Sequence, residues 1–88
     1  MEVAYTASFL RMLAKLPQGL QEEVIEKVDL FREVKNHQQL KVHALRGALV
    51  GRYSFSVNYK IRIVFSYLST KPKEALLHAI GDHDIYKG

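Results

Sequence analysis

The sequence contains no cysteine, so the chain has no disulfide framework and no thiolate that would act as a nucleophile. No apolar run approaches the roughly 20 residues that a membrane-spanning helix needs. The first residues, MEVAYTASFLRMLAKLP, also lack the basic leader and long apolar run of a signal peptide. Together these absences favour a cytoplasmic protein.

Several motifs of known chemistry are missing as well. The sequence has no glycine-rich phosphate loop and no GxSxG nucleophile motif. Its four histidines and nine acidic residues show no spacing typical of a zinc or calcium site. We therefore expect no metal and no cofactor, and any reaction would depend on the chain's own side chains.

Acidic residues are absent from the middle of the chain. Residues 34–73 contain eight basic side chains and no Asp or Glu, whereas residues 1–33 and 74–88 each carry an excess of two acidic side chains. The net charge of +4 therefore originates in the middle 40 residues. Such a field favours a polyanion or an acidic protein partner, although a basic face kept for solubility is an equally good interpretation.

Hydrophobic periodicity predicts one α+β domain spanning residues 1–88. Apolar steps of three and four predict helices over 7–17 and 18–36, joined closely enough to form a helical hairpin. Strands are expected over 1–6, 52–58, 59–68 and 74–81. The predicted architecture is this N-terminal helical hairpin packed on one face of a small, mainly antiparallel four-stranded sheet.

The two central strands predict what each face of the sheet carries. One face holds the apolar residues Tyr53, Phe55, Val57, Ile61, Ile63 and Phe65, and we expect the helices to cover it. The other face carries Arg52, Ser54, Ser56 and Arg62, which predicts a polar, basic and partly open surface.

Arg62 is the most informative charge, because a mid-strand arginine is costly unless it faces water or a partner, and its planar fork suits phosphate. His83 follows Gly81 at the end of the last strand, where histidine is a natural acid or base. Tyr86 is a second proton donor or a packing anchor. His43 lies near Lys41 and Arg46 and is either a proton-transfer group or a plain loop histidine.

Arginine, histidine and tyrosine without metal or cysteine fit one reaction well. RNA carries its own nucleophile, the 2′-hydroxyl, so a protein need only move protons and stabilise the charge that develops on phosphorus. The remaining histidines have no such context. We expect His78, within an apolar strand, to be a hydrogen-bonded core residue.

The order of elements resembles the RelE/ParE superfamily of bacterial toxins over nearly the whole chain. The most specific stretches are LRG at 45–47, YKIRIVF at 59–65 and IGDHDIY at 80–86. The resemblance implies a RelE-like fold and, in the RelE and YafQ branch, a ribosome-associated mRNA endonuclease that cleaves without metal through the 2′-hydroxyl. It also implies a cognate antitoxin as partner.

The resemblance assigns roles by position. Arg62 resembles the arginine that stabilises the transition state, and Arg46 the arginine before the loop glycine. The catalytic set it implies is Arg62, His83, Tyr86 and His43. Charge adds a predicted RNA-binding set, which is Lys41, Arg46, Arg52 and Lys60.

Departures from the family keep some roles open. Ser54 and Ser56 stand where RelE has lysines, so the general base is either His43 or His83. The alternatives to a nuclease are a ParE-like inhibitor that binds DNA gyrase and an inactive member that binds only its antitoxin. The retained set of Arg62, His83 and Tyr86 favours the nuclease.

Overall fold

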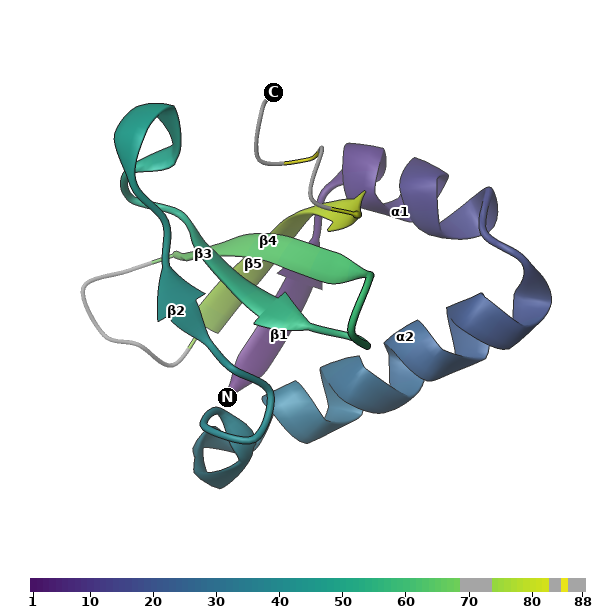
Figure 1. The fold of residues 1–88 in the computed structure, drawn as a ribbon, viewed down its shortest axis with the longest axis horizontal. Coiled ribbons are helices and arrows are strands. Elements are labelled where there is room, and N and C mark those ends of the chain that lie inside the picture. Colours follow the sequence, from purple (N-terminus) through teal and green to yellow (C-terminus); the bar gives the residue numbers. More distant parts are fainter. Residues whose placement is uncertain (69–73, 83–84, 86–88) are drawn as a thin grey trace.

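The chain folds as two α-helices and a five-stranded sheet within residues 1–68, 74–82 and 85, the part that this computed structural model describes (Figure 1). The elements are β1 (Glu2–Tyr5), α1 (Ala7–Ala14), α2 (Gln18–Phe31), the 3₁₀ turn η1 (Val34–Asn36), β2 (His43–Ala44), the 3₁₀ turn η2 (Gly47–Leu49), β3 (Tyr53–Ser56), β4 (Arg62–Tyr67) and β5 (Glu74–Gly81). The strand order is β1-β5-β4-β3-β2. Only β1 and β5 are parallel among these pairs, so the predicted α+β class is confirmed.

The expected number of four strands is wrong by one, because the described chain contains the additional strand β2. This strand is only two residues long and pairs His43 with Ser54 and Ala44 with Tyr53. Two residues are too few to show the alternation by which the other strands are recognised. The extra strand extends the sheet at its β3 edge and brings the segment before it close to the β3–β4 hairpin.

Helix α1 begins as predicted and α2 ends earlier than predicted. The Thr6 hydroxyl caps α1 by accepting a hydrogen bond from the Phe9 amide at 2.9 Å. The expected helix over 18–36 stops at Phe31, where two side chains satisfy the free carbonyls. Asn36 donates to the Leu30 carbonyl, and the His37 ring bonds the Phe31 carbonyl, each at 2.8 Å. The chain then turns through η1 toward the sheet.

The core lies between the helices and one face of the sheet, which we call the inner face. Phe31 of α2 stacks on Phe55 of β3 with ring centroids 4.3 Å apart, and meets Phe65 of β4 edge-on at 4.7 Å. Phe9 of α1 is also fully buried. These contacts confirm the inner-face prediction, and β5 lies in the interior of the sheet between β1 and β4, as its apolar sequence indicates.

The opposite, outer face is less open than predicted. Its middle is closed, because Ser54 and Val64 are 0% and 4% exposed. At one end, the chain folds back after β5. The Ile85 amide donates to the Asp82 carbonyl at 3.1 Å, and the Ile85 side chain lies directly over Gly81. The outer face therefore does not form the continuous basic surface that was predicted. Its two arginines lie at opposite ends of the strands, with buried residues between them.

Candidate functional site

Arg62 opens β4, and the β3–β4 hairpin holds its guanidinium in place. It donates to the carbonyls of Asn58, of Tyr59 at 3.1 Å and of Ile61 at 3.3 Å. A guanidinium has five N–H donors, so these three bonds leave two donors, including the one on Nε, without a partner among the described residues. The cation is fixed in orientation and can still form a two-pronged contact with phosphate.

Asn58 organises the hairpin that holds Arg62. Its side-chain oxygen accepts hydrogen bonds from the amides of Lys60 and Ile61, each at 2.8 Å. Its side-chain amide donates to the Glu23 carboxylate on α2, which ties the hairpin to the helix. The position of Arg62 therefore depends on a short chain of contacts that ends on α2.

A basic groove of about 250 Å³ lies beside this hairpin. Its lining residues come from α2, from the segment before β2 and from the hairpin: Lys27, Gln39, Leu40, Lys41, Ser56, Val57, Asn58, Tyr59 and Arg62. Three of them are cations and none is acidic. Among the described residues, one lining cation forms an ion pair: Lys27, whose Nζ lies 4.0 Å from the Glu26 carboxylate. We call this hollow the basic groove, and its charge suits a phosphate-bearing ligand.

Backbone geometry places Lys41 in the basic groove. Lys41 has a φ of 60°, in the left-handed region that non-glycine residues seldom adopt. The chain reverses here so that the Leu40 carbonyl accepts from the Ser56 amide at 2.9 Å. Lys41 thus lies across from Ser56 and near Arg62. Tyr59, at the hairpin tip, is 91% exposed and leaves an aromatic ring free at the rim.

The structure brings together some of the predicted site residues. Arg62 and Lys41 line the basic groove, and Lys60 is exposed on the same hairpin. His43 is exposed, and its Nδ1 bonds the Lys41 carbonyl at 2.8 Å, so the ring lies near the groove without lining it. Two basic residues lie elsewhere. Arg46 is exposed where η2 begins, and Arg52 precedes β3 at the far end of the outer face.

His83 and Tyr86 lie outside the described residues, so their predicted roles remain predictions. The register of β4 and β5 bears on where the chain enters that segment. Arg62 pairs with Gly81, and Asp82 follows at once. The chain therefore leaves the sheet beside Arg62.

Sequence reasoning missed Lys27 and Tyr59 as groove residues. Lys27 lies on a helix far from the hairpin in sequence, and it is the tertiary contact of Glu23 with Asn58 that brings this part of α2 to the hairpin tip. Tyr59 did carry a signal, since an aromatic residue at a hairpin tip has no core to join. From the sequence, the segment Asn58-Tyr59-Lys60 predicts only a turn and does not identify the exposed ring as a binding group.

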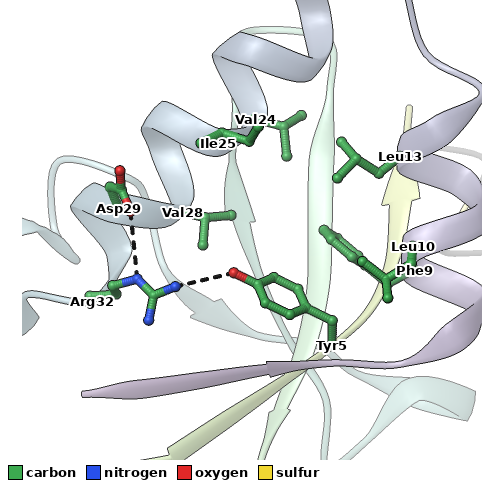
Figure 2. Close-up of a pocket in the computed structure, with 9 residues that line it drawn as sticks. All are labelled: Tyr5, Phe9, Leu10, Leu13, Val24, Ile25, Val28, Asp29 and Arg32. Carbon is green, nitrogen blue, oxygen red and sulfur yellow. Dashed lines mark hydrogen bonds and ion pairs between the residues drawn. The ribbon is translucent and has the colours of Figure 1, made fainter.

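A second hollow of about 190 Å³ lies between the helices and β1 (Figure 2). It is mostly apolar, and the Leu10 and Ile25 side chains remain half exposed along it. Its polar groups are occupied with one another, because Arg32 donates to the Tyr5 hydroxyl at 3.1 Å and lies 3.6 Å from Asp29. This hollow offers packing surface, whereas the basic groove offers Lys41 and Arg62, two cations that form no ion pair within the described residues.

His78 and Tyr67 have shifted affinities for protons. Burial, with a smaller contribution from Arg52, lowers the pKa of His78, and burial together with Tyr53 raises the pKa of Tyr67. Among residues 1–68, 74–82 and 85, no cluster of three or more metal-binding side chains occurs. The helices in this part of the chain are too short or too polar to cross a membrane.

The sequence matches no family model, and no curated protein is significantly similar to it. Solved structures do share its fold. YafQ from Escherichia coli has a TM-score of 0.75 at 16% identity, covering 99% of this chain and 98% of that one. A chain of the toxin–antitoxin complex RelBE2 from Mycobacterium tuberculosis has a TM-score of 0.73 at 20% identity, covering 93% and 96%. The YoeB/ParE toxin from Agrobacterium tumefaciens has a TM-score of 0.65 at 15% identity, covering 94% and 99%.

Proposed function

We propose, from the premise that this chain has the fold of RelE/ParE superfamily toxins, that it is the toxin of a toxin–antitoxin pair and cleaves mRNA on the ribosome. The observation that carries the proposal is the fixed Arg62 guanidinium beside the basic groove. A preorganised cation stabilises a charged transition state without having to reorient during the reaction.

The proposed reaction needs three actions from the protein. The 2′-oxygen of the RNA attacks the neighbouring phosphorus and loses its proton to a base, while the bond from phosphorus to the 5′-oxygen breaks and that oxygen gains a proton. The products are a 2′,3′-cyclic phosphate and a 5′-hydroxyl. The two remaining donors of Arg62 stabilise the charge on phosphorus, and Lys41 and Lys27 hold the flanking backbone.

The proton-transfer groups are proposed from the sequence. His83 and Tyr86 follow the strand end at which Arg62 and Gly81 pair. His43 is the alternative base, and its Nδ1 is already bonded to the Lys41 carbonyl. If that nitrogen carries the proton, Nε2 is the free acceptor, as a general base requires.

The antitoxin is the second proposed partner. The solved complexes of similar fold include RelBE2 from Mycobacterium tuberculosis and the RelE–RelB complex from Pyrococcus horikoshii. In this chain the region with eight basic and no acidic residues would attract an acidic, amphipathic segment. Such a segment would cover the basic groove and exclude RNA from it.

Expression of the chain alone tests the proposal. The nuclease should arrest translation and leave transcripts cut on ribosomes, with cyclic phosphate at the new 3′ ends. Arg62→Ala should abolish both effects, whereas Arg11→Ala, which removes an exposed cation on α1, should not. Growth arrest with intact mRNA and blocked replication would contradict the proposal and favour a ParE-like gyrase inhibitor. Undiminished cleavage by Arg62→Ala would refute the catalytic assignment.

A further inference from the structure

Three polar residues meet on the outer face, at the end opposite Arg62. Tyr53 pairs with Phe65, and continuing this register by one residue beyond β3 brings Arg52 opposite Ser66. The register of β4 and β5 shifts after Val64, which pairs with Ala79, because Phe65 pairs with Leu77. His78 is therefore the extra residue of a β-bulge, and bulges often re-aim a side chain. Its Nε2 lies 2.7 Å from the Ser66 hydroxyl.

The positive charge of Arg52 in this cluster is not balanced by an acidic side chain of the described residues. Arg52 is half-buried and makes no ion pair within the described part of the chain. It lies close enough to His78 to depress the imidazole's affinity for a proton. The Thr6 hydroxyl bonds the backbone carbonyl of His78 at 3.3 Å, so it leaves the ring free. The cluster thus presents a guanidinium, a hydroxyl and an imidazole nitrogen without an acidic partner.

We propose that Arg52, Ser66 and His78 bind one phosphodiester of single-stranded RNA and so form a second phosphate subsite. The guanidinium supplies charge, and the phosphate takes the place of the Ser66–His78 hydrogen bond, so that the serine O–H and the single N–H of the neutral ring each donate to it. Ser66 lies four residues along β4 from Arg62, which is about 13 Å. Both residues are on the outer face, so one short RNA segment can reach both subsites.

This inference rests on the proposed function, because it assigns the anion to an RNA strand. A half-buried Arg52 without a carboxylate partner is the reason to expect a ligand, since burying an uncompensated charge is unfavourable. An isolated hydrogen bond between serine and histidine would account for Ser66 and His78 alone and would leave Arg52 unexplained. The predicted ligand contact involves all three.

The test measures RNA affinity without cleavage. A short single-stranded RNA with 2′-deoxy substitutions, which has no nucleophile, is bound to the wild-type protein and to Arg52→Gln, Ser66→Ala and Arg11→Gln. Fluorescence anisotropy gives the affinity over a range of salt concentrations. Arg52→Gln should bind about tenfold or more weakly, and its slope of log affinity against log salt should fall by about 0.7. Arg11→Gln removes the same charge from exposed α1 and should change neither quantity.

A second measurement identifies the residues that touch the anion. Inorganic phosphate should shift the imidazole NMR signals of His78 in the wild-type protein and not in Arg52→Gln. Ser66→Ala provides a further variant, which retains His78 but removes the hydroxyl beside its ring. It should weaken the phosphate shift while circular dichroism shows the fold intact.

The outcomes separate this inference from the proposed function. Loss of affinity in Arg52→Gln, without any mRNA cleavage by the wild-type protein, would support the subsite and contradict the nuclease. Cleavage with unchanged affinity in Arg52→Gln and Ser66→Ala would overturn the subsite and leave the nuclease standing. A defect confined to binding an acidic antitoxin peptide would also overturn it, because the cluster would then recognise a protein.

Discussion

Arg62 and Gly81 face each other as paired residues at the ends of β4 and β5. Both positions point to the outer face, where the Ile85 side chain lies over the glycine. A Cβ atom at position 81 would come within 2.5 Å of the Ile85 methyl group Cγ2, a distance that no real contact tolerates. The glycine is therefore needed for close packing of the chain that follows β5.

Gly81→Ala should displace Ile85 and destabilise the protein by about 1–3 kcal/mol, the usual cost of overpacking. Chemical denaturation measures the loss. Ile85→Ala removes the obstructing methyl, so the double variant should be more stable than the sum of the single changes predicts. Strict additivity would show that the two side chains do not collide. RNA cleavage should fall in Gly81→Ala, because the segment leading to His83 and Tyr86 would shift.

The fixed guanidinium predicts how Arg62 variants behave. Arg62→Ala should lower the cleavage rate by about 10²–10³-fold, as expected for removal of a preorganised donor to a developing charge. Arg62→Lys should recover little activity, because an ammonium cannot bond the hairpin carbonyls and phosphate with the same fork. Rates are measured on ribosome-bound mRNA. Full activity in the lysine variant would show that charge alone suffices.

Asn58 should matter for both stability and catalysis. Asn58→Asp keeps the oxygen that accepts from the Lys60 and Ile61 amides but places a carboxylate against Glu23. We expect a loss of about 1–3 kcal/mol in unfolding free energy. That corresponds to a melting temperature lower by at least about 4 °C in a domain of this size. Activity should fall as well, because Arg62 loses its platform.

Glu23→Gln provides the matched partner for this variant. The amide of a glutamine at position 23 can donate to the carboxylate that Asn58→Asp introduces. The double variant should recover stability and activity together if the hairpin-to-helix contact positions Arg62. Recovery of stability without activity would mean that Asn58 acts on catalysis through another route.

His78 predicts a dependence of stability on acid. Burial and Arg52 lower its pKa below the usual 6.5, so the unfolded chain binds a proton more readily than the folded one. The stabilising effect of the neutral ring is complete above pH 6.5 and is lost as pH falls below that value. Unfolding free energies measured from about pH 7.5 to 5 should therefore fall more steeply for the wild type than for His78→Gln. Parallel curves would show that His78 titrates normally.

The sequence indicated the elements of this fold better than their ends. Alternation over 52–68 identifies the inner face correctly, because Phe55 and Phe65 are buried against the helices. The early end of α2 depends on the side chains of Asn36 and His37 returning to its carbonyls, which helical periodicity does not reveal. Strand β2 has too few residues to show any period.

The site was predictable in part. Arg62 was expected in the middle of a strand, facing water or a partner, and it is instead the first residue of β4. The basic middle of the chain does mark a cationic surface. The hydrogen bonds that fix Arg62 depend on the conformation of the hairpin, and Lys27 reaches the groove only through tertiary packing. His78 was assigned to the core, because alternation gives no sign of the bulge that turns it toward Ser66.

The parallel pairing of β1 with β5 joins segments about seventy residues apart, with Val3 beside Ala75 and Tyr5 beside Leu77. Synthesis proceeds from the N-terminus, so β1 must wait without its partner until β5 has been added. A long-range closure of this kind is intrinsically slow. The nascent chain therefore acquires its complete sheet only late in translation, which gives a binding partner made earlier time to be present when the finished fold first appears.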